Sequence, residues 1–332
     1  MYDIPFHNGN LSEYTFLVTG GAGFIGSNIV EYLLKYGAQK VRVLDNFSTG
    51  FRKNIDQFNN NGAFELMEGD IRDMETCLKA VSGIDYVSHQ AALGSVPRSI
   101  NDPITTNAVN INGFLNLLVA ARDENSIQRL IYAASSSTYG DSTLLPKVEG
   151  KEGKPLSPYA VTKLVDELYA DVFSKVYGLH TIGLRYFNVF GPRQNLKGAY
   201  AAVIPLFMRA AINRETPIIN GDGETSRDFT FVENAVQANI KALLNTTGLS
   251  QHEAVNIACG ERISLNELWE MISNLANFNQ TPNYGPERSG DVRHSLANIS
   301  KARGLFGYNP NWKMKAGLEV AFKFYNDSLS SF

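Results

Sequence analysis

The sequence predicts an α/β fold in which a doubly wound parallel sheet is followed by a smaller C-terminal α/β lobe. Apolar strand-like runs alternate with helix-like runs over the first 185 residues, a rhythm typical of parallel strands covered by helices on both faces. The predicted strands are residues 15–18, 40–44, 64–68, 86–89, 129–134 and 180–185. The predicted helices are residues 24–36, 74–81, 105–122 and 159–177. A glycine-rich stretch between the first strand and the first helix is the third observation.

That stretch, from Thr19 to Gly26, predicts a loop that binds a diphosphate. Gly21, Gly23 and Gly26 fit the pattern G-x-G-x-x-G, in which glycines turn the chain and let the backbone approach a pyrophosphate. The following helix N-terminus then offers unpaired N–H groups and a favourable dipole to the phosphates. A tight turn without a ligand is the alternative for such a motif taken alone. The predicted contacts are Gly20, Gly23, Phe24, Ile25 and Gly26.

An acidic residue closes the second predicted strand. Asp45 lies about 20 residues beyond the loop, where a carboxylate accepts from a ribose 2′-hydroxyl and repels a 2′-phosphate. Loop and acid together predict a Rossmann domain that binds NAD, with Asn46 next to Asp45 in the same contact region. Arg42, Arg52 and Lys53 lie nearby and leave NADP as an alternative. Taken alone, Asp45 could also be an ordinary strand-end residue.

The regular rhythm ends after residue 185, and this change predicts two parts. Residues 1–13 precede the first strand without a motif, and they either pack on the surface or fray. The Rossmann domain is predicted to comprise residues 1–185, with 226–258 returning to it, and the substrate lobe residues 186–225 and 259–332.

Composition excludes several classes of protein. A net charge of −3 and a pI near 6.0 give no basic field for nucleic acid or an anionic membrane. No secretory signal is expected in the first ten residues, and no apolar stretch is long enough to span a membrane. Two distant cysteines, Cys77 and Cys259, suit a reducing cytoplasm. The five histidines lack ligand-like spacing, so no metal site is expected.

A second motif carries the chemistry. Tyr159 and Lys163 form Y-x-x-x-K on one face of a predicted helix, and a cation beside a phenol favours the phenolate that acts as a base. The motif alone is common in surface helices. It gains weight from Ser135, Ser136 and Ser137, which follow the strand 129–134, because sites in open α/β sheets gather at the carboxyl ends of strands.

These motifs in order resemble the extended short-chain dehydrogenase/reductase family, and within it the nucleotide-sugar 4-epimerases. The family shares T-G-x-x-G-x-x-G, a serine-rich strand end, Y-x-x-x-K and a later R-Y-F-N, here at residues 185–188. The resemblance runs from about residue 14 almost to the end of the chain. It implies NAD as the cofactor, a UDP-sugar as the substrate, and Tyr159, Lys163, Ser135 and Ser136 as catalytic residues.

The resemblance also implies further cofactor contacts. Asn110 matches the asparagine that steadies the active-site helix in the family, with an ordinary helical polar residue as the alternative. Asp70 could instead cap the next helix, and Tyr186 with Phe187 could belong to the core. The implied residues, besides Tyr159 and Lys163, are Asp70, Ile71, Gln90, Ala91, Ala92, Asn110 and Tyr186.

On the substrate side, the resemblance implies that Arg227 and Arg288 neutralise the diphosphate, since guanidinium groups suit phosphate oxygens. Surface charge is the alternative for each. Asp291 resembles a contact to the uridine ribose. The complete implied set is Ser95, Ser136, Ser137, Tyr159, Asn188, Val203, Arg227, Arg288, Asp291 and Ser295.

The serine-rich strand end favours simple 4-epimerisation. The resemblance implies an Asp-Glu pair at this point in 4,6-dehydratases and a Glu in decarboxylases, whereas this chain has only hydroxyls. The resemblance implies that Ser295 occupies the position where a small residue admits an N-acetyl group and a bulky tyrosine restricts the site to plain hexoses. The loop 94–103 resembles that of bacterial UDP-N-acetylglucosamine 4-epimerases of polysaccharide synthesis. We therefore expect conversion of UDP-N-acetylglucosamine to UDP-N-acetylgalactosamine. Use of UDP-glucose, a uronic-acid 4-epimerase and a non-catalytic nucleotide-sugar binder are the alternatives.

Family members commonly dimerise through the two helices predicted at residues 105–122 and 159–177. A homodimer is therefore expected. The apolar positions Leu117, Leu118, Leu164 and Leu168 support it, although they could equally be core.

Overall fold

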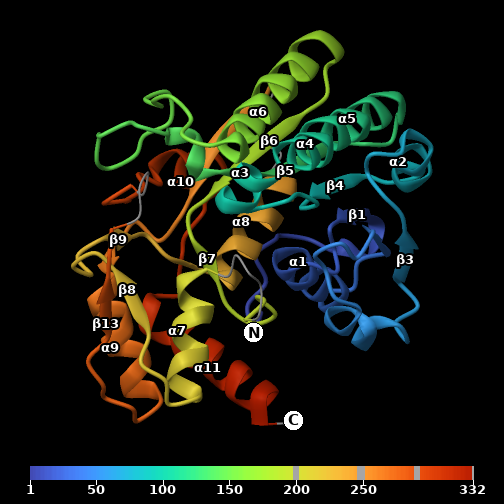
Figure 1. Ribbon diagram of the computed structural model, residues 1–332. Helices are drawn as coiled ribbons and strands as arrows, with labels where there is room; N and C mark the ends of the chain where they lie inside the picture. Colours follow the sequence, from blue (N-terminus) through green and yellow to red (C-terminus); the bar gives the residue numbers. More distant parts are fainter. Residues whose placement is uncertain (197–201, 245–250, 288–291, 331–332) are drawn as a thin grey trace.

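The computed structural model describes residues 1–196, 202–244, 251–287 and 292–330, and its centre is a seven-stranded parallel sheet (Figure 1). The strand order is β11-β6-β5-β4-β1-β2-β3, so the chain winds outward in both directions from β1, as predicted. Six of the strands lie within one residue of the predicted ranges, and β11 joins β6 as a seventh. Their bounds are β1 Thr15–Thr19, β2 Lys40–Asp45, β3 Phe64–Glu68, β4 Tyr86–His89, β5 Arg129–Ser135, β6 Thr181–Tyr186 and β11 Glu253–Ile257.

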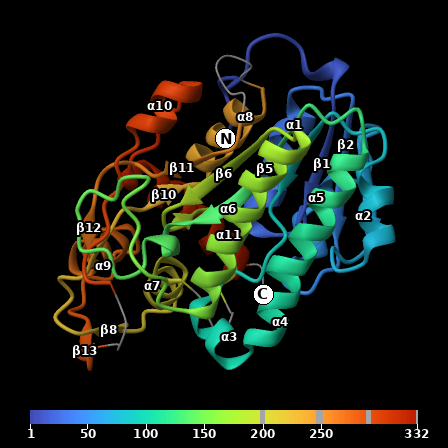
Figure 2. The ribbon, with the colours of Figure 1, turned by 90° about the horizontal axis from the view of Figure 1, so that it is seen from above.

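Helices cover both faces of the sheet (Figure 2). On one face, α1 packs against α8 through buried residues such as Ile29 and Val236. On the other face, α2, α5 and α6 share a second core that includes Phe114 and Leu117. The doubly wound α/β architecture predicted from the sequence is therefore confirmed. These helices are α1 Phe24–Lys35, α2 Met74–Val81, α5 Gly113–Asp123, α6 Pro158–Tyr177 and α8 Val232–Leu244.

The helix predicted at 105–122 is interrupted and starts earlier. Asp102 caps α4, which spans Pro103–Asn107, by accepting from the N–H of Thr105 at 3.0 Å. A π-helical turn, Ala108–Asn112, separates α4 from α5. Single π turns within helices often mark functional positions, since they re-aim the side chains around them. The short helix α3, Val96–Asn101, precedes this region.

A second lobe lies below the sheet in the view of Figure 1 and has its own apolar core, which includes Phe207, Trp269 and Leu318. Its helices α7, α9 and α11 pack on one another, and two-stranded pairs fill the rest. The helices of this lobe are α7 Val203–Ile212, α9 Leu265–Leu275 and α11 Met314–Ser330. Helix α10, Ser300–Phe306, instead packs against β11 and α8 of the sheet domain. The remaining strands are β7 Val189–Phe190, β8 Ile218–Asn220, β9 Ser226–Arg227, β10 Thr230–Phe231, β12 Ile263–Ser264 and β13 Asn283–Gly285.

The N-terminal residues pack against the sheet domain rather than fray. The Tyr2 side chain is fully buried, and its hydroxyl donates to Asn28 at 2.9 Å. Phe6 stacks on Tyr32 of α1, with ring centroids 5.1 Å apart. In the part of the chain that the structure describes, no helix is long and apolar enough to cross a membrane.

Candidate active site

A cavity of about 590 Å³ opens at the carboxyl ends of the central strands. It follows β1, β2, β4, β5 and β6, and therefore lies where the strand order reverses around β1. Crevices of this kind are where open α/β sheets bind their ligands. Two groups of predicted residues meet there: those assigned to the cofactor and those assigned to catalysis.

The glycine-rich loop forms one wall of the cavity. Gly20 has a left-handed backbone, with φ at 68°, and a Cβ added to it would lie 2.7 Å from the backbone nitrogen of Ala91. A Cβ on Gly26 would overlap the carbonyl oxygen of Gly20. Gly23 caps α1 without a side-chain hydrogen bond, so the first N–H groups of the helix are left for a ligand. Phe24 and Ile25 line the cavity beside them.

Asp45 lines the cavity at the end of β2. Its carboxylate accepts from the N–H of Ala22 at 2.9 Å and from that of Phe47 at 2.8 Å. Burial raises the pKa of Asp45, and these two N–H donors partly offset that effect. Asp45 thus links the glycine-rich loop to the end of β2.

The three basic residues that left NADP as an alternative cofactor contact other groups of the protein. Arg52 pairs with Glu68 and lies over the ring of Phe47 at 4.2 Å, and Arg42 donates to the carbonyl of Ala80 at 2.8 Å. Lys53 lies 5.7 Å from the ring centroid of Phe51. The glycine cradle and the carboxylate therefore fit NAD, with its free ribose 2′-hydroxyl, better than NADP.

Asp70 and Ile71 line the same end of the cavity. Asn46 donates to Asp70 at 2.8 Å, and the guanidinium of Arg72 lowers the pKa of Asp70 to about 2. The helix cap considered for Asp70 is instead supplied by Asp73, which accepts from the N–H of Thr76. Sequence reasoning missed Ser48 and Thr49, which line the cavity a few residues after Asp45.

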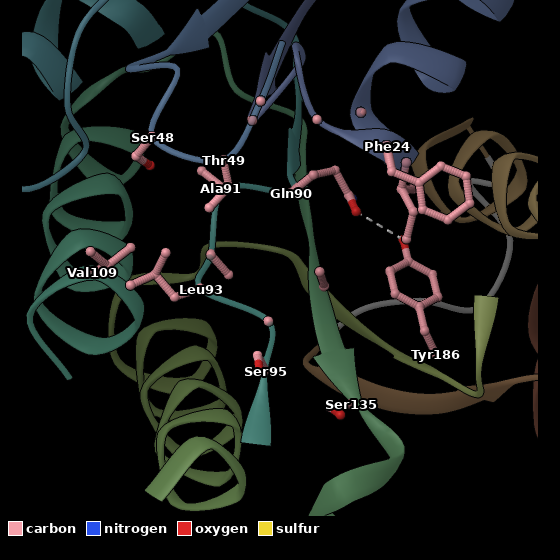
Figure 3. A pocket seen from close by; sticks show the side chains of 18 of the residues that line it. Phe24, Ser48, Thr49, Gln90, Ala91, Leu93, Ser95, Val109, Ser135 and Tyr186 are labelled. Carbon is pink, nitrogen blue, oxygen red and sulfur yellow. Dashed lines mark hydrogen bonds between the residues drawn. The ribbon is translucent and has the colours of Figure 1, made fainter. Parts of the chain in front are cut away.

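Gln90 and Tyr186 point toward one another across the cavity (Figure 3). The Tyr186 hydroxyl donates to the Gln90 side-chain oxygen at 3.3 Å and accepts from Asn239 of α8 at 2.7 Å. Burial raises the pKa of Tyr186, which is therefore a neutral phenol. Ala91 and Ala92 also line the cavity, whereas Phe187 is buried in the core. No motif pointed to Asn239.

The predicted catalytic residues converge on the opposite wall. Tyr159 and Lys163 lie on α6, and Ser135 and Ser136 lie at the end of β5; all four line the cavity. Ser137 does not line it. The hydroxyl and the N–H of Ser137 donate to the Ser135 hydroxyl oxygen at 2.9 and 3.1 Å.

The ammonium of Lys163 lies 3.1 Å from the carboxylate of Asp166 on the next turn of α6. Burial lowers the pKa of Lys163, but the neighbouring acidic groups, Asp166 above all, outweigh it, so the pKa is raised overall. Lys163 is therefore charged at neutral pH. Beside a phenol, a fixed positive charge favours transfer of the phenolic proton.

Asn110 lies beside this wall and does not line the cavity. It sits on the π turn, where its side-chain oxygen accepts from the N–H of Leu93 at 2.8 Å. Its side-chain nitrogen donates to the Thr162 hydroxyl at 3.0 Å and to the Leu93 carbonyl at 3.3 Å. Asn110 therefore ties α6 to the loop after β4, a positioning role rather than a contact.

The predicted substrate residues are divided. Ser95 and Asn188 line the cavity, and Asn188 has an unusual φ of 38° while its side chain donates to the carbonyl of Asp228 at 3.0 Å. Val203 does not line it, although the preceding Ala202 does. Gly94 and Arg98, from the loop 94–103, also line the cavity. Sequence reasoning missed further lining residues that carry no motif, among them Leu93, Val109, Gln194 and Asn195.

Arg227 and Ser295 lie next to each other in the second lobe and outside the cavity lining. The guanidinium of Arg227 donates to the carbonyl of Ser226 at 3.0 Å, and the N–H of Ser295 donates to the same carbonyl at 3.0 Å. The predicted residues Arg288 and Asp291 lie outside the described residues.

Comparisons with known proteins agree with this geometry. A sequence model described as the NAD dependent epimerase/dehydratase family matches residues 16–258. A UDP-glucose 4-epimerase of Mycolicibacterium smegmatis is 33% identical over 313 residues, which is 94% of this chain and 98% of that protein.

Two solved structures are also similar. A UDP-N-acetylglucosamine 4-epimerase from Methanobrevibacter ruminantium M1, in complex with UDP-N-acetylmuramic acid, is 38% identical with a TM-score of 0.89 over 96% of this chain and 99% of that chain. A UDP-glucuronic acid 4-epimerase from Bacillus cereus, in complex with UDP-glucuronic acid and NAD, is 30% identical with a TM-score of 0.88 over 95% of this chain and 99% of that chain.

Proposed function

We propose that this chain, which belongs to the NAD-dependent epimerase/dehydratase family, interconverts UDP-N-acetylglucosamine and UDP-N-acetylgalactosamine by inverting C4 of the sugar. NAD is the cofactor of the family, and the glycine cradle with Asp45 suits it. The observation that carries the proposal is the catalytic wall, where hydroxyls of Ser135 and Ser136 share the cavity with Tyr159 and Lys163.

The absence of a second acid on this wall favours epimerisation over elimination. Among the described lining residues, the carboxylates are Asp45, which ends β2, and Asp70, which follows β3. Removal of water from a sugar needs an acid and a base in addition to hydride transfer. Inversion at C4 needs only a hydride and one proton, which a phenol and a hydroxyl can handle.

In this mechanism, Tyr159 removes the proton from the sugar O4, and Ser135 or Ser136 holds that oxygen. Lys163 favours the phenolate through its positive charge. NAD, when bound, accepts a hydride from C4 and returns it to the opposite face of the 4-keto sugar. Tyr159 then gives the proton back to O4, so the enzyme ends in its starting state.

The N-acetylated substrate is inferred from Ser295. Ser295 lies outside the cavity lining. In the family that the sequence resembles, a small side chain at this position leaves room beside C2 for the acetamido group, and a UDP-N-acetylglucosamine 4-epimerase is among the similar structures. Ser295→Tyr should abolish turnover of N-acetylated sugars and spare UDP-glucose. Ser295→Ala, which keeps the side chain small, is the control. Equal loss of turnover on both sugars in Ser295→Tyr would contradict this selection by size at C2.

Turnover without added cofactor tests the proposal as a whole. The purified protein is incubated separately with UDP-N-acetylglucosamine, UDP-glucose and UDP-glucuronic acid, and the C4 configuration is followed by proton NMR. Formation of the N-acetylgalactosamine product supports the proposal and indicates NAD retained through purification. Turnover of UDP-glucuronic acid alone would replace it with a uronic-acid epimerase. No turnover even with NAD supplied would favour a non-catalytic binder.

A homodimer through α6 is a further part of the proposal. Leu117 and Leu118 are fully buried in the core and belong to no interface, but Leu168 and Val176 are more than half exposed on α6. Ile104 on the neighbouring α4 is exposed as well. Light scattering of the wild type and of Leu168→Lys measures the mass. A wild-type protein of single-chain mass would refute this interface.

Both cysteines are buried thiols, in keeping with the expected cytoplasmic location.

A further inference from the structure

The catalytic helix contains a buried ion pair whose acidic member has no part in the chemistry above. Lys163 and Asp166 lie three residues apart on α6, with side chains only 3% and 2% exposed. One carboxylate oxygen of Asp166 contacts the ammonium at 3.1 Å. The other oxygen is buried and finds no hydrogen-bond partner among the described residues. A buried carboxylate with one unpaired oxygen lowers the free energy of unfolding, and this cost is consistent with a functional role for Asp166.

The neighbouring charges leave Asp166 as the counter-ion of Lys163. Glu167, also on α6, is engaged by Arg185 of β6 at 2.7 Å. Burial, with the charge of Lys163, lowers the pKa of His89 on β4 to about 3, so this imidazole is neutral. Tyr132 on β5 is a buried phenol whose pKa is raised by burial and by the charges of Glu167 and Asp166.

Tyr159 is the remaining titratable group beside Lys163. It lies one turn before Lys163, and Asp166 lies one turn after, so the three share one face of α6. Burial raises the pKa of Asp166 and the charge of Lys163 lowers it, which together leave it at about 6. The carboxylate is therefore ionised at neutral pH.

We propose that Asp166 is a positioning residue that keeps the buried Lys163 ammonium protonated and directed along the helix face shared with Tyr159. The inference rests on the proposed function, since Lys163 matters to the reaction only through Tyr159 and the cofactor. Without the carboxylate, Lys163 loses the largest of the influences that raise its pKa, and burial, which favours the neutral amine, weighs more against Tyr159 and Glu167. The neutral amine no longer favours the phenolate.

The pH dependence of stability tests this inference without any turnover. In Asp166→Asn, the pKa of Lys163 in the folded chain falls below its value in the unfolded chain, where it is about 10.4. The unfolded chain then binds more protons, so the stability of the variant rises with pH relative to wild type. We expect the gap in Tm between wild type and Asp166→Asn to shrink by at least half from about pH 7 to about pH 10. A gap that stays constant over this range would overturn the inference.

Two further variants serve as controls for this measurement. Asp171→Asn removes a carboxylate from an exposed pair with Lys175 on the same helix and should leave the pH dependence unchanged. Lys163→Met combined with Asp166→Asn removes both buried charges and should abolish the pH-dependent gap. If Asp166→Asn fails to fold, recovery of folding in the double variant supports the inference. Failure of both variants to fold, or an equal pH-dependent gap in both, overturns it.

A kinetic measurement separates this inference from the proposed function. Wild-type epimerase activity is recorded first as a function of pH, and its absence would refute the proposed function alone. If the wild type is active, Asp166→Asn should lose activity at lower pH on the alkaline side, because its Lys163 gives up the proton earlier. An unchanged alkaline limb, together with an unchanged kcat, would refute the role of Asp166 and leave the proposed function standing.

Discussion

Replacement of Asn110 by alanine should loosen the catalytic helix, although Asn110 itself does not line the cavity. The Asn110 side chain is buried and makes three hydrogen bonds, to the N–H and carbonyl of Leu93 and to the hydroxyl of Thr162. Each buried backbone group left unpaired costs roughly 1–3 kcal/mol, and the bond to the Leu93 carbonyl is long. We therefore expect the free energy of unfolding to fall by about 2–4 kcal/mol. At roughly 2 °C for each kcal/mol in a chain of this size, Tm falls by about 4–8 °C.

The same substitution should slow the reaction, because Thr162 lies between Tyr159 and Lys163 and donates to the Tyr159 carbonyl at 2.8 Å. A small displacement of that turn is expected to lower kcat about tenfold, with NAD affinity little changed. Scanning calorimetry, the NMR turnover assay and NAD titration supply the three measurements. Asn112→Ala, at an exposed position of the same π turn, is the matched control. A variant with unchanged Tm and a large loss of NAD affinity would refute the reasoning, since it would make Asn110 a direct cofactor contact.

Three other predictions concern Asp45 and Gly20 in the cavity wall and Arg227 in the second lobe. Asp45→Ala should weaken NAD binding about tenfold and improve NADP binding, because the carboxylate that repels a 2′-phosphate is gone. Calorimetric titration with both cofactors measures the two affinities, and an unchanged preference for NAD over NADP would contradict this role. Arg227→Met should raise KM for the UDP-sugar about tenfold with kcat nearly constant if the guanidinium meets the diphosphate, whereas an unchanged KM would remove Arg227 from the site. Gly20→Ala should lower NAD affinity at least tenfold, since its φ is 68° and the new Cβ would lie 2.7 Å from the Ala91 nitrogen; binding equal to wild type would contradict that close approach.

The sheet and its phosphate loop were predictable from sequence because their signals are local. Apolar runs of strand length, and glycines placed before an apolar helix, owe little to distant parts of the chain. Asp45 was predictable for the same reason, since its distance from the loop is fixed by one strand–helix–strand unit. The family resemblance then located Tyr159 and the serine-rich strand end.

What escaped prediction depends on contacts between distant segments. Asn239 reaches Tyr186 and Gln90 from α8, and no local pattern singles it out. The partner of Lys163 is close in sequence, but only burial makes Asp166 its counter-ion. No motif indicated the π turn at residues 108–112, which carries Asn110 and interrupts the single helix predicted at 105–122.

The late position of β11 bears on how the chain is made. The strand pairs with the edge of β6, yet it is synthesised about 70 residues after β6 ends, once part of the second lobe has been translated. At about 5–20 residues per second, a ribosome leaves that edge without its partner for roughly 4–14 s. An unpaired strand edge is a template for aggregation, so the nascent chain is most in need of chaperone protection during this interval. A fragment that ends at residue 186 would keep the open edge permanently.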